Sequence, residues 1–394
     1  MVVAGTISLI IIISLIVPGP YLKRYYIFAA IVMGSLYFFA KPLSSDCYRL
    51  YQMRDAMKNI SWETLLAMKE KEYGNEQLNI YIPHYPLFAA YTKIVSYLPR
   101  PLFMVIPCTM MYMVPLRFCF DRNLYDPRKW VYVLSYTYYL FATDYISTAA
   151  SRNISVGTLF CLFLYEEIIH KANKVICFIG YVLLLFIHSY ASLLILTRIL
   201  TLICEFGGKR MKALLLLATV SGYTLLTSPI INMTLGRISI FSYVINKLTE
   251  YSVYTGTAVN TRRYFMLLIY ILIVVLCFLC EKYIICRMDR HEQKIYGEWL
   301  TFLQLEIAYT VGSFSQYDTF VRGSFFILPS FGILLRRCIP MIGDIRFGDI
   351  HFRTYEQRII HTFIYVGGMG MAVVLIAYFT WIGYVWMDNW FQLG

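Results

Sequence analysis

The feature that most constrains this chain is a series of long apolar stretches that contain no Asp, Glu, Lys or Arg. Two of them read VVAGTISLIIIISLIVPGPYL (residues 2–22) and YFMLLIYILIVVLCFLC (residues 264–280). A helix needs about 20 mostly apolar residues to cross the hydrocarbon core of a bilayer. Only 15% of the residues are charged, whereas a soluble domain carries about 25%. We therefore predict an all-α, polytopic integral membrane protein.

The apolar stretches predict a bundle of about 12 transmembrane helices, and a total of about 10 or 11 also fits the pattern. We place the helices at residues 3–18, 25–40, 102–119, 130–147, 153–169, 174–188, 190–206, 212–230, 264–282, 298–316, 323–337 and 362–386. Residues 1–22 resemble a secretory signal peptide but lack its basic start and its small-x-small cleavage site, so we interpret them as the first helix. Residues 85–98 are too few to span and include Lys93, which predicts an amphipathic or re-entrant segment on the membrane.

Lys and Arg residues concentrate in alternate connections between the predicted helices. These basic connections are residues 19–24, 120–129, 170–173, 207–211, 283–297 and 338–361. The positive-inside rule assigns them to the cytoplasm and both termini to the outer side. We therefore expect one transmembrane domain, residues 1–394, in which outer loops 41–101 and 231–263 cover the functional site. This orientation explains the net charge of +12. The sequence contains no basic tail and no Lys/Arg run, so we expect no nucleic-acid partner.

The ten cysteines do not indicate a disulfide framework, because only Cys47 falls in a predicted outer loop. Cys277 and Cys280 have the spacing of a CxxC pair, but they lie inside an apolar run, so we predict no metal or redox site there. Glycine-rich phosphate loops, HExxH and nucleophile-elbow motifs are also absent from the sequence.

Charged residues nevertheless occur at almost every helix junction on the predicted outer side, where few basic residues are expected. They are Asp46, Arg49, Arg54, Asp144, Arg152, His188, Arg237, Lys247, Arg262, Arg263, Asp318 and Arg322. A single arginine at a bilayer surface is explained equally well by a lipid headgroup or a helix end. The whole set, in which Arg152 and Arg322 are each expected to open a helix, predicts an outward-facing pocket for an anionic ligand.

Glu306 differs from these residues because it lies well inside the predicted helix 298–316. A carboxylate at that depth must face the bundle or a cavity. Two roles are open, a structural hydrogen bond to a neighbouring helix and a contact to substrate or a proton. Arg198, in the helix at 190–206, is a plausible partner.

Four short segments occur in an order that is typical of one enzyme family. They are Asp46-Cys47-Tyr48-Arg49-Leu50-Tyr51, Ser151-Arg152-Asn153, Phe186-Ile187-His188-Ser189 followed by Ala191-Ser192-Leu193-Leu194, and Arg322 followed by Phe325-Phe326. In these segments, and in helix order and loop lengths over most of the chain, the protein resembles the EpsG family of Wzy-type polysaccharide polymerases. The resemblance implies a bundle similar to that of GT-C glycosyltransferases.

The resemblance also implies an activity. Such polymerases transfer a growing glycan from undecaprenyl pyrophosphate to the nonreducing end of a new lipid-linked repeat unit. They act at the outer face of the bacterial cytoplasmic membrane, with the active site facing the periplasm or the exterior. The implied partners are undecaprenyl-pyrophosphate-linked glycans, membrane lipid and a chain-length-regulating co-polymerase, and no cofactor, nucleotide sugar or metal is expected. The product could be O-antigen of lipopolysaccharide, capsule or exopolysaccharide.

The resemblance assigns roles to individual residues. Asp46 and His188 are the candidate catalytic bases, because an acceptor hydroxyl must lose its proton. Contacts to the substrate are assigned to Arg49, Arg152, Arg237, Arg262, Arg263, Asp318 and Arg322. At a partly dry helix junction His188 should stay neutral, as a base must. The alternative roles are a helix cap to a backbone carbonyl for His188 and an ion pair with Arg49 for Asp46.

Two other functions fit a helical membrane protein of this kind. A GT-C-type polyprenyl-phosphate-sugar glycosyltransferase would also carry an acidic residue in its first outer loop. It would usually add a larger outer domain or a second acidic residue beside the first, whereas Ser45 precedes Asp46 here. A flippase for lipid-linked oligosaccharides should show two similar helix bundles around a central charged cavity, and the two halves of this sequence show no such similarity.

Overall fold

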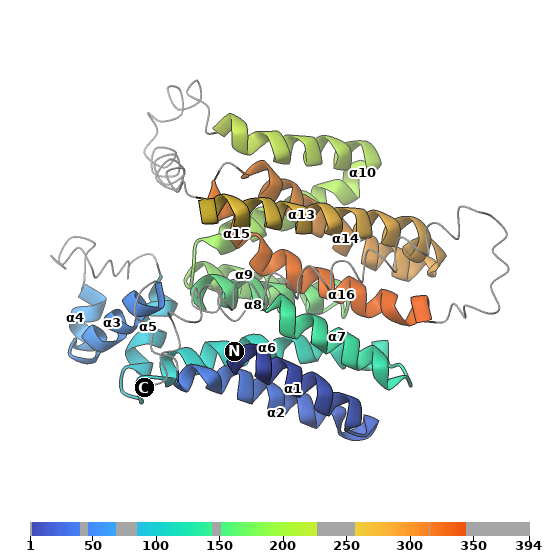
Figure 1. Cartoon of the computed structure of the whole chain (residues 1–394). Coiled ribbons are helices and arrows are strands. Elements are labelled where there is room, and N and C mark those ends of the chain that lie inside the picture. Colours follow the sequence, from blue (N-terminus) through green and yellow to red (C-terminus); the bar gives the residue numbers. More distant parts are fainter. Residues whose placement is uncertain are drawn as a thin grey trace. The chain divides into compact units, whose positions relative to one another are not determined.

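The computed structural model describes residues 2–39, 46–67, 85–143, 151–226, 257–314 and 316–343, and every regular element among them is a helix (Figure 1). The helices are α1 (Val2–Ile16), α2 (Leu22–Ser35), α3 (Asp46–Lys58), α4 (Trp62–Ala67), α5 (Pro86–Val95), α6 (Leu102–Cys119), α7 (Lys129–Ala142), α8 (Ser151–Ile168), α9 (Lys174–Leu185), α10 (Tyr190–Leu226), α13 (Thr257–Leu279), α14 (Arg290–Gly312), α15 (Tyr317–Arg322) and α16 (Ser324–Gly343). For these described residues the prediction of an all-α protein is confirmed.

Four described helices are long and apolar enough to cross a membrane. Their apolar spans are Leu102–Cys119, Tyr190–Ser221, Arg263–Lys282 and Thr319–Pro340, and Gly5–Ile16 and Lys174–Leu185 are shorter apolar helices. The larger total of about 12 spans stays a prediction, and its last helix, 362–386, lies outside the described residues.

The sequence placed two helices, at 190–206 and 212–230, where the structure has α10. Gly208 interrupts α10 with a positive φ of 66° and a ψ of −163°, so the helix is broken at this point. L-residues other than glycine rarely adopt this backbone conformation. The predicted break is therefore present, although α10 continues on both sides of it.

The structure divides into two compact units. The described part of the first unit contains α1 to α9, the start of α10 up to Ser192, and residues 335–340 of α16. The described part of the second contains α10 from Leu193, α13 to α15, and α16 up to Leu334, with residues 341–343.

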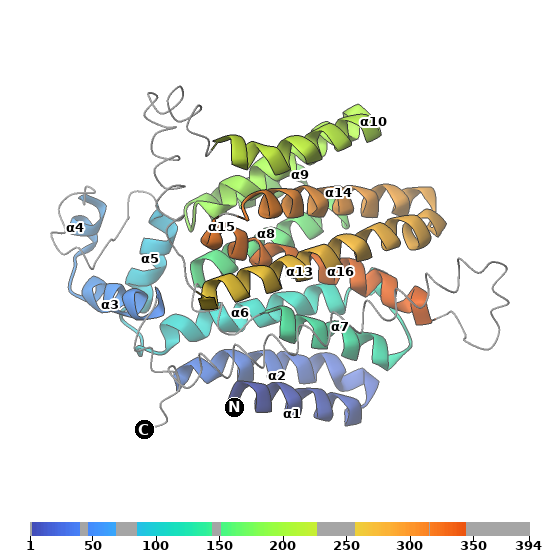
Figure 2. The ribbon, with the colours of Figure 1, turned by 45° about the horizontal axis from the view of Figure 1, so that its top comes forward.

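The first unit is built around α2 and α6, which lie side by side in both ribbon views (Figures 1 and 2). Gly34 makes this close approach possible, because a Cβ there would lie 1.9 Å from Oγ1 of Thr109 on α6. Tyr26 packs on Tyr136 of α7 with 4.2 Å between ring centroids, and both side chains are buried. The core of this unit is thus formed by tyrosine rings and one closely packed helix pair.

Two helices that the sequence did not predict, α3 and α4, lie in the predicted outer loop 41–101. The α3 helix packs on α5, where Lys93 is only 1% exposed. Its Nζ donates to the carbonyls of Met57 at 2.9 Å, Lys58 at 3.4 Å and Ile60 at 2.5 Å. A buried ammonium is tolerated here because it binds the unpaired carbonyls and the negative end of α3. Lys93 is therefore a helix cap and does not face a polar surface.

The second unit is held by polar contacts between α10, α14 and α16. Oγ1 of Thr197 donates to the Glu306 carboxylate at 3.1 Å, and Glu306 is fully buried. Nε1 of Trp299 donates to the Ser330 carbonyl at 3.1 Å. Arg198 forms its ion pair with Glu298, at 2.6 Å. The structure thus supports the structural role of Glu306 and shows an ion pair of Arg198 with Glu298.

Within the first unit, several of the predicted cytoplasmic connections meet at one end of the helices. Nζ of Lys129 donates to the Leu15 carbonyl at 2.7 Å, and this contact joins the start of α7 to the end of α1. Nε2 of His170 lies 2.7 Å from Oδ2 of Asp121, and Nε of Arg336 donates to the Cys119 carbonyl at 2.9 Å. The predicted connections 19–24, 120–129 and 170–173 therefore lie at the same end of the helices of the first unit.

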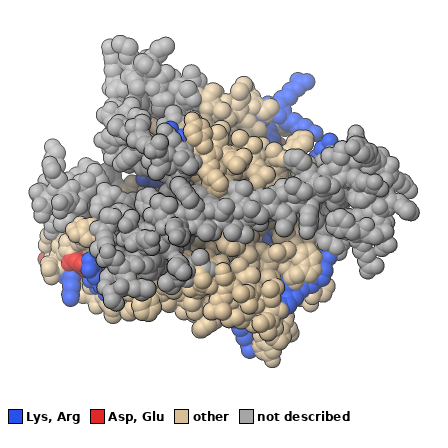
Figure 3. All heavy atoms as spheres, in the orientation of Figure 1, with Lys and Arg blue, Asp and Glu red and all other residues tan. Residues whose placement is uncertain are grey.

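A similar contact occurs in the second unit, where Lys212 lies 3.9 Å from Glu281, so the break in α10 is near the end of α13. In Figure 3 the visible described surface is largely uncharged, and the visible Lys and Arg side chains, in blue, form a few separate groups. This distribution agrees with a membrane protein.

Candidate functional site

The candidate site lies where three helix ends of the first unit meet: the start of α5, the start of α8 and the turn between α9 and α10. The backbone amides of Leu87 and Phe88, in the first turn of α5, donate to the Phe186 carbonyl at 3.1 and 3.3 Å. These amides have no partner within their own helix, so the turn after α9 provides one. The contact fixes Tyr85, which caps α5, beside the His188 turn.

His188 is the sequence-predicted residue whose hydrogen bonding is clearest. The α9 helix ends at Leu185, and Nδ1 of His188 accepts a hydrogen bond of 3.1 Å from the backbone amide of Tyr190, the first residue of α10. The half-buried imidazole therefore caps α10 through an amide. The sequence suggested a cap to a backbone carbonyl as the alternative role, and the hydrogen bond of Nδ1 is instead to a backbone amide. Because Nδ1 accepts, a neutral imidazole must carry its proton on Nε2, which makes the ring a donor.

Arg152 is the second residue of α8, so the prediction that it opens a helix is confirmed. Its half-buried guanidinium carbon lies 5.0 Å from the Phe88 ring centroid and 5.7 Å from that of Tyr85. The Tyr85 ring also lies near the imidazole ring of His188, with 5.7 Å between the ring centroids and 9° between the ring planes. The structure thus brings together Arg152 and His188, two residues far apart in the sequence, through Tyr85.

This arrangement suits an anionic ligand that carries a ring. An arginine fork binds phosphate or pyrophosphate through two parallel hydrogen bonds. The amides at the start of a helix add partial positive charge. Aromatic faces provide apolar surface and hold the cation by cation–π attraction.

The other predicted site residues are described only in part. Arg237 lies outside the described residues, as does the outer-junction residue Asp144. The backbones of Asp46 and Arg49 are in α3, that of Arg262 is in α13 and that of Asp318 is in α15, but their side chains lie outside the description. The hypothesis that Asp46 pairs with Arg49 therefore stays untested.

Two predicted arginines belong to the second unit. Arg263 in α13 is half-buried, with its guanidinium carbon 5.6 Å from the Phe314 ring centroid. Arg322 is the last residue of the short helix α15, and α16 begins at Ser324. The expectation that Arg322 opens a helix is therefore wrong, because Gln316 and Gly323 delimit a separate helical turn before α16.

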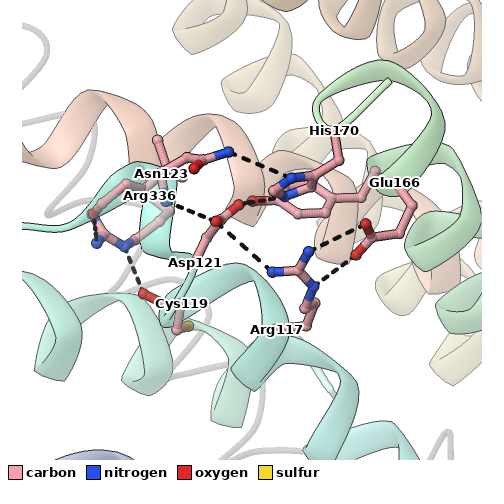
Figure 4. Close-up of polar contacts among 9 residues, drawn as sticks. Arg117, Cys119, Asp121, Asn123, Glu166, His170 and Arg336 are labelled. Carbon is pink, nitrogen blue, oxygen red and sulfur yellow. Dashed lines mark hydrogen bonds and ion pairs between the residues drawn. The ribbon is translucent and has the colours of Figure 1, made fainter. Parts of the chain in front are cut away.

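Sequence reasoning missed a second polar cluster, at the opposite end of α8 from Arg152 (Figure 4). Its centre is Asp121, just after α6, whose side chain is 1% exposed. The carboxylate accepts hydrogen bonds from the Tyr165 hydroxyl, from Nε2 of His170 at 2.7 Å and from the Asn123 amide at 2.9 Å. The only sequence signal was an acidic residue in a basic connection, which is too common to indicate a site.

The environment of Asp121 determines its charge. Burial opposes ionisation, but the hydrogen bonds from Tyr165, Asn123 and His170 outweigh it and hold the pKa of Asp121 below its ordinary value. Beside it, Arg117 binds Glu166 through two nitrogens, with Nε–Oε1 at 2.7 Å and Nη2–Oε2 at 3.2 Å. Asp121 is therefore ionised at neutral pH, and Arg117 beside it is paired with Glu166.

Among the described residues, no group of three or more His, Cys, Asp and Glu side chains has an arrangement that could hold a metal ion. No protein-family model matches the chain, and no curated protein or solved structure matches it either.

Proposed function

We propose that this protein is a membrane glycosyltransferase of the Wzy polymerase type, which joins undecaprenyl-pyrophosphate-linked oligosaccharide repeat units into a surface polysaccharide. The observation that supports the proposal best is the grouping of Arg152, His188 and Tyr85 at one junction of three helix ends. The resemblance of four ordered sequence segments to the EpsG family is the second support.

In this proposal Arg152 binds the pyrophosphate of the donor lipid. Its side chain is half-buried beside two aromatic rings, where a charge is less screened than in water. It also stands at the N-terminus of α8, so the helix and the guanidinium favour an anion at the same place. Tyr85 would pack against a sugar ring of the glycan.

The proposed reaction forms one glycosidic bond for each repeat unit. The acceptor hydroxyl oxygen attacks the anomeric carbon of the growing glycan, and the bond from that carbon to the pyrophosphate oxygen breaks. Undecaprenyl pyrophosphate leaves with the electron pair, and Arg152 stabilises the charge that develops on it. The hydroxyl proton passes to a base.

Asp46 becomes the better candidate for that base. Nδ1 of His188 already accepts a hydrogen bond from the Tyr190 amide, so this nitrogen is engaged, and in the neutral ring the other nitrogen, Nε2, carries the proton and is a donor. We therefore assign proton acceptance to Asp46 and orientation of the substrate to His188.

The wider setting belongs to the same proposal. It comprises about 12 membrane spans in one domain, outer loops 41–101 and 231–263 over the site, and the bacterial cytoplasmic membrane with the site on its outer face. It also comprises a chain-length-regulating co-polymerase as partner.

The test is a gel of surface glycan from a strain that lacks this gene and is complemented with wild type, Arg152→Gln or the control Arg210→Gln. Arg210 is exposed at the break in α10, so its loss removes the same charge elsewhere. The deletion should leave single repeat units on the acceptor lipid, and wild type and Arg210→Gln should restore a ladder. Arg152→Gln, at equal protein level, should reduce polymer formation about 100-fold.

The two alternatives give different gels. If the deletion removes even the single repeat unit, the protein acts earlier, as a GT-C-type polyprenyl-phosphate-sugar glycosyltransferase or as a lipid-linked oligosaccharide flippase. Accumulation of complete repeat units on the cytoplasmic side would favour the flippase, and truncated repeat units would favour the earlier transferase.

A further inference from the structure

A cavity of about 470 Å³ lies next to the Asp121 cluster, at the end of the first unit where the basic connections meet. It is lined by Lys23, Ile27, Met113, Leu116, Arg117, Phe120, Asp121, Arg122, Asn123 and His170. Its volume falls within the range of small-molecule sites, which is about 300–1,000 Å³. The reaction proposed above uses none of these residues.

The charges around this cavity are not balanced. The Arg117 guanidinium is engaged by Glu166, and both oxygens of Asp121 are engaged by donors of their own cluster (Figure 4). Lys23 and Arg122 have exposed side chains, and neither has an ion-pair partner among the described residues. Lys23 and Arg122 therefore line the cavity without an ion-pair partner in the part of the chain that the structure describes.

The positions of these cations favour an anion further. Lys23 is the second residue of α2, so the positive end of that helix adds to its charge. Arg122 is in the turn that follows α6, and the Asn123 side chain beside it carries amide donors. A tetrahedral oxyanion can accept hydrogen bonds from several such donors at once.

One wall of the cavity is apolar. Ile27 of α2 and Met113 and Leu116 of α6 line it, and Phe120 follows them at the end of α6. Apolar side chains of this kind can contact glycerol and the first carbons of acyl chains. A cavity lined by both cations and aliphatic side chains matches the two parts of a phospholipid headgroup region.

We propose that this cavity is a binding site for a phosphate group, carried by an anionic glycerophospholipid or supplied as free phosphate. The site is at the opposite end of α8 from Arg152 and is independent of the proposed polymerase reaction. Lys23 and Arg122 are the main contacts, and the paired Asp121 cluster holds the turn that carries Arg122.

Binding can be measured on the purified full-length protein in detergent, by titration with three probes. They are inorganic phosphate, dioctanoyl phosphatidylglycerol and dioctanoylglycerol, which keeps the chains but lacks the phosphate. The variant Lys23→Gln/Arg122→Gln should bind the phosphate-bearing probe about 100-fold more weakly, since each charge-assisted contact is worth about tenfold or more. The matched control Lys209→Gln/Arg210→Gln loses the same charge from exposed positions of the second unit.

Each outcome decides the proposal. Binding of phosphatidylglycerol but not of phosphate identifies a lipid as the source, and equal binding of both identifies a soluble phosphate. Either result supports the site if binding is lost in the Lys23→Gln/Arg122→Gln variant and kept in the control variant. Equal affinity for dioctanoylglycerol, equal loss in both double variants or absence of binding by all probes would overturn the proposal. Both substituted side chains are exposed, so thermal unfolding should confirm that the variant is folded.

Discussion

At the scale of single residues, the structure changes the role that the sequence suggested for His188. The sequence identified it as an unusual polar residue between apolar helices, and it does lie at a helix junction beside Arg152. The backbone amide of Tyr190 determines which imidazole nitrogen of His188 accepts a hydrogen bond, and the spacing of residues in the sequence could not show this. Asp121 was missed, and the helix-capping role of Lys93 was not foreseen, because both depend on partners that are distant in sequence.

The cap formed by His188 leads to a prediction that separates stability from function. In His188→Asn the amide oxygen can accept the Tyr190 hydrogen bond, so the variant should keep its stability, whereas His188→Ala should lose about 1 kcal/mol. Both variants lack the Nε2 donor and should lose activity. Thermal unfolding in detergent measures the first effect and glycan synthesis the second. Equal destabilisation of the two variants would show that the cap does not stabilise α10.

The lowered pKa of Asp121 leads to the prediction that the protein's stability falls at acidic pH. Its folded pKa lies below that of the unfolded carboxyl, which is about 3.9. The stabilisation is therefore fully present above about pH 5 and is lost as the pH falls through the folded pKa. Asp121→Asn should remove about 2 kcal/mol at neutral pH, because three donors lose a charged acceptor.

Unfolding midpoints of wild type, Asp121→Asn and Glu63→Gln, measured from pH 7 to pH 3, check this expectation. Glu63 is an exposed residue of α4, so its variant should follow wild type. The Asp121→Asn curve should approach wild type at low pH. A constant difference over the whole range would contradict the assigned role of the carboxylate.

At the scale of elements, most of the described fold could be predicted from apolar runs. Such runs identify α1, α2, α6 to α9, α13, α14 and α16 because lipid requires apolar helices of a minimum length. The α3 and α4 helices were missed because they are short and polar, and α3 is stabilised by the Lys93 cap and by packing on α5. The separate α15 was missed because a six-residue helix leaves no periodic signal.

The approach of α2 to α6 gives a prediction at this scale. Gly34→Ala places a Cβ 1.9 Å from Oγ1 of Thr109 and 2.7 Å from its Cα, so the helices must separate. We expect a loss of about 1–3 kcal/mol. Gly5→Ala in α1 is the matched control, because a Cβ there has no atom within 4 Å and alanine favours a helix. Thermal unfolding compares them, and equal stability of both variants would contradict the packing described.

At the scale of the whole molecule, the contacts within each unit support the alternation of helix ends that the distribution of basic residues predicted. In the first unit the Asp121 cluster and the Arg152–Tyr85–His188 group lie at opposite ends of α8. Which end faces the cytoplasm follows only from the positive-inside rule. Membrane sidedness is therefore the property for which the sequence carries more information than the fold.

Sidedness can be tested at the two ends of α9. Ser189 follows this helix and Lys171 precedes it, and both are exposed. A membrane-impermeant maleimide should label Ser189→Cys in intact cells and Lys171→Cys only after permeabilisation. The native Cys286, which is exposed, and Cys47, which falls in a predicted outer loop, should first be replaced by serine. Labelling of Lys171→Cys in intact cells would reverse the orientation and place the Arg152 site in the cytoplasm.

The most direct test of the account is synthesis by the purified protein from undecaprenyl-pyrophosphate-linked repeat units alone, without a nucleotide sugar. We predict a ladder of polymers, with one undecaprenyl pyrophosphate released for each new glycosidic bond. Arg152→Gln should slow the reaction about 100-fold, while Arg210→Gln should match wild type. A ladder that forms equally well with Arg152→Gln, or release of no undecaprenyl pyrophosphate by folded wild-type protein, would contradict it.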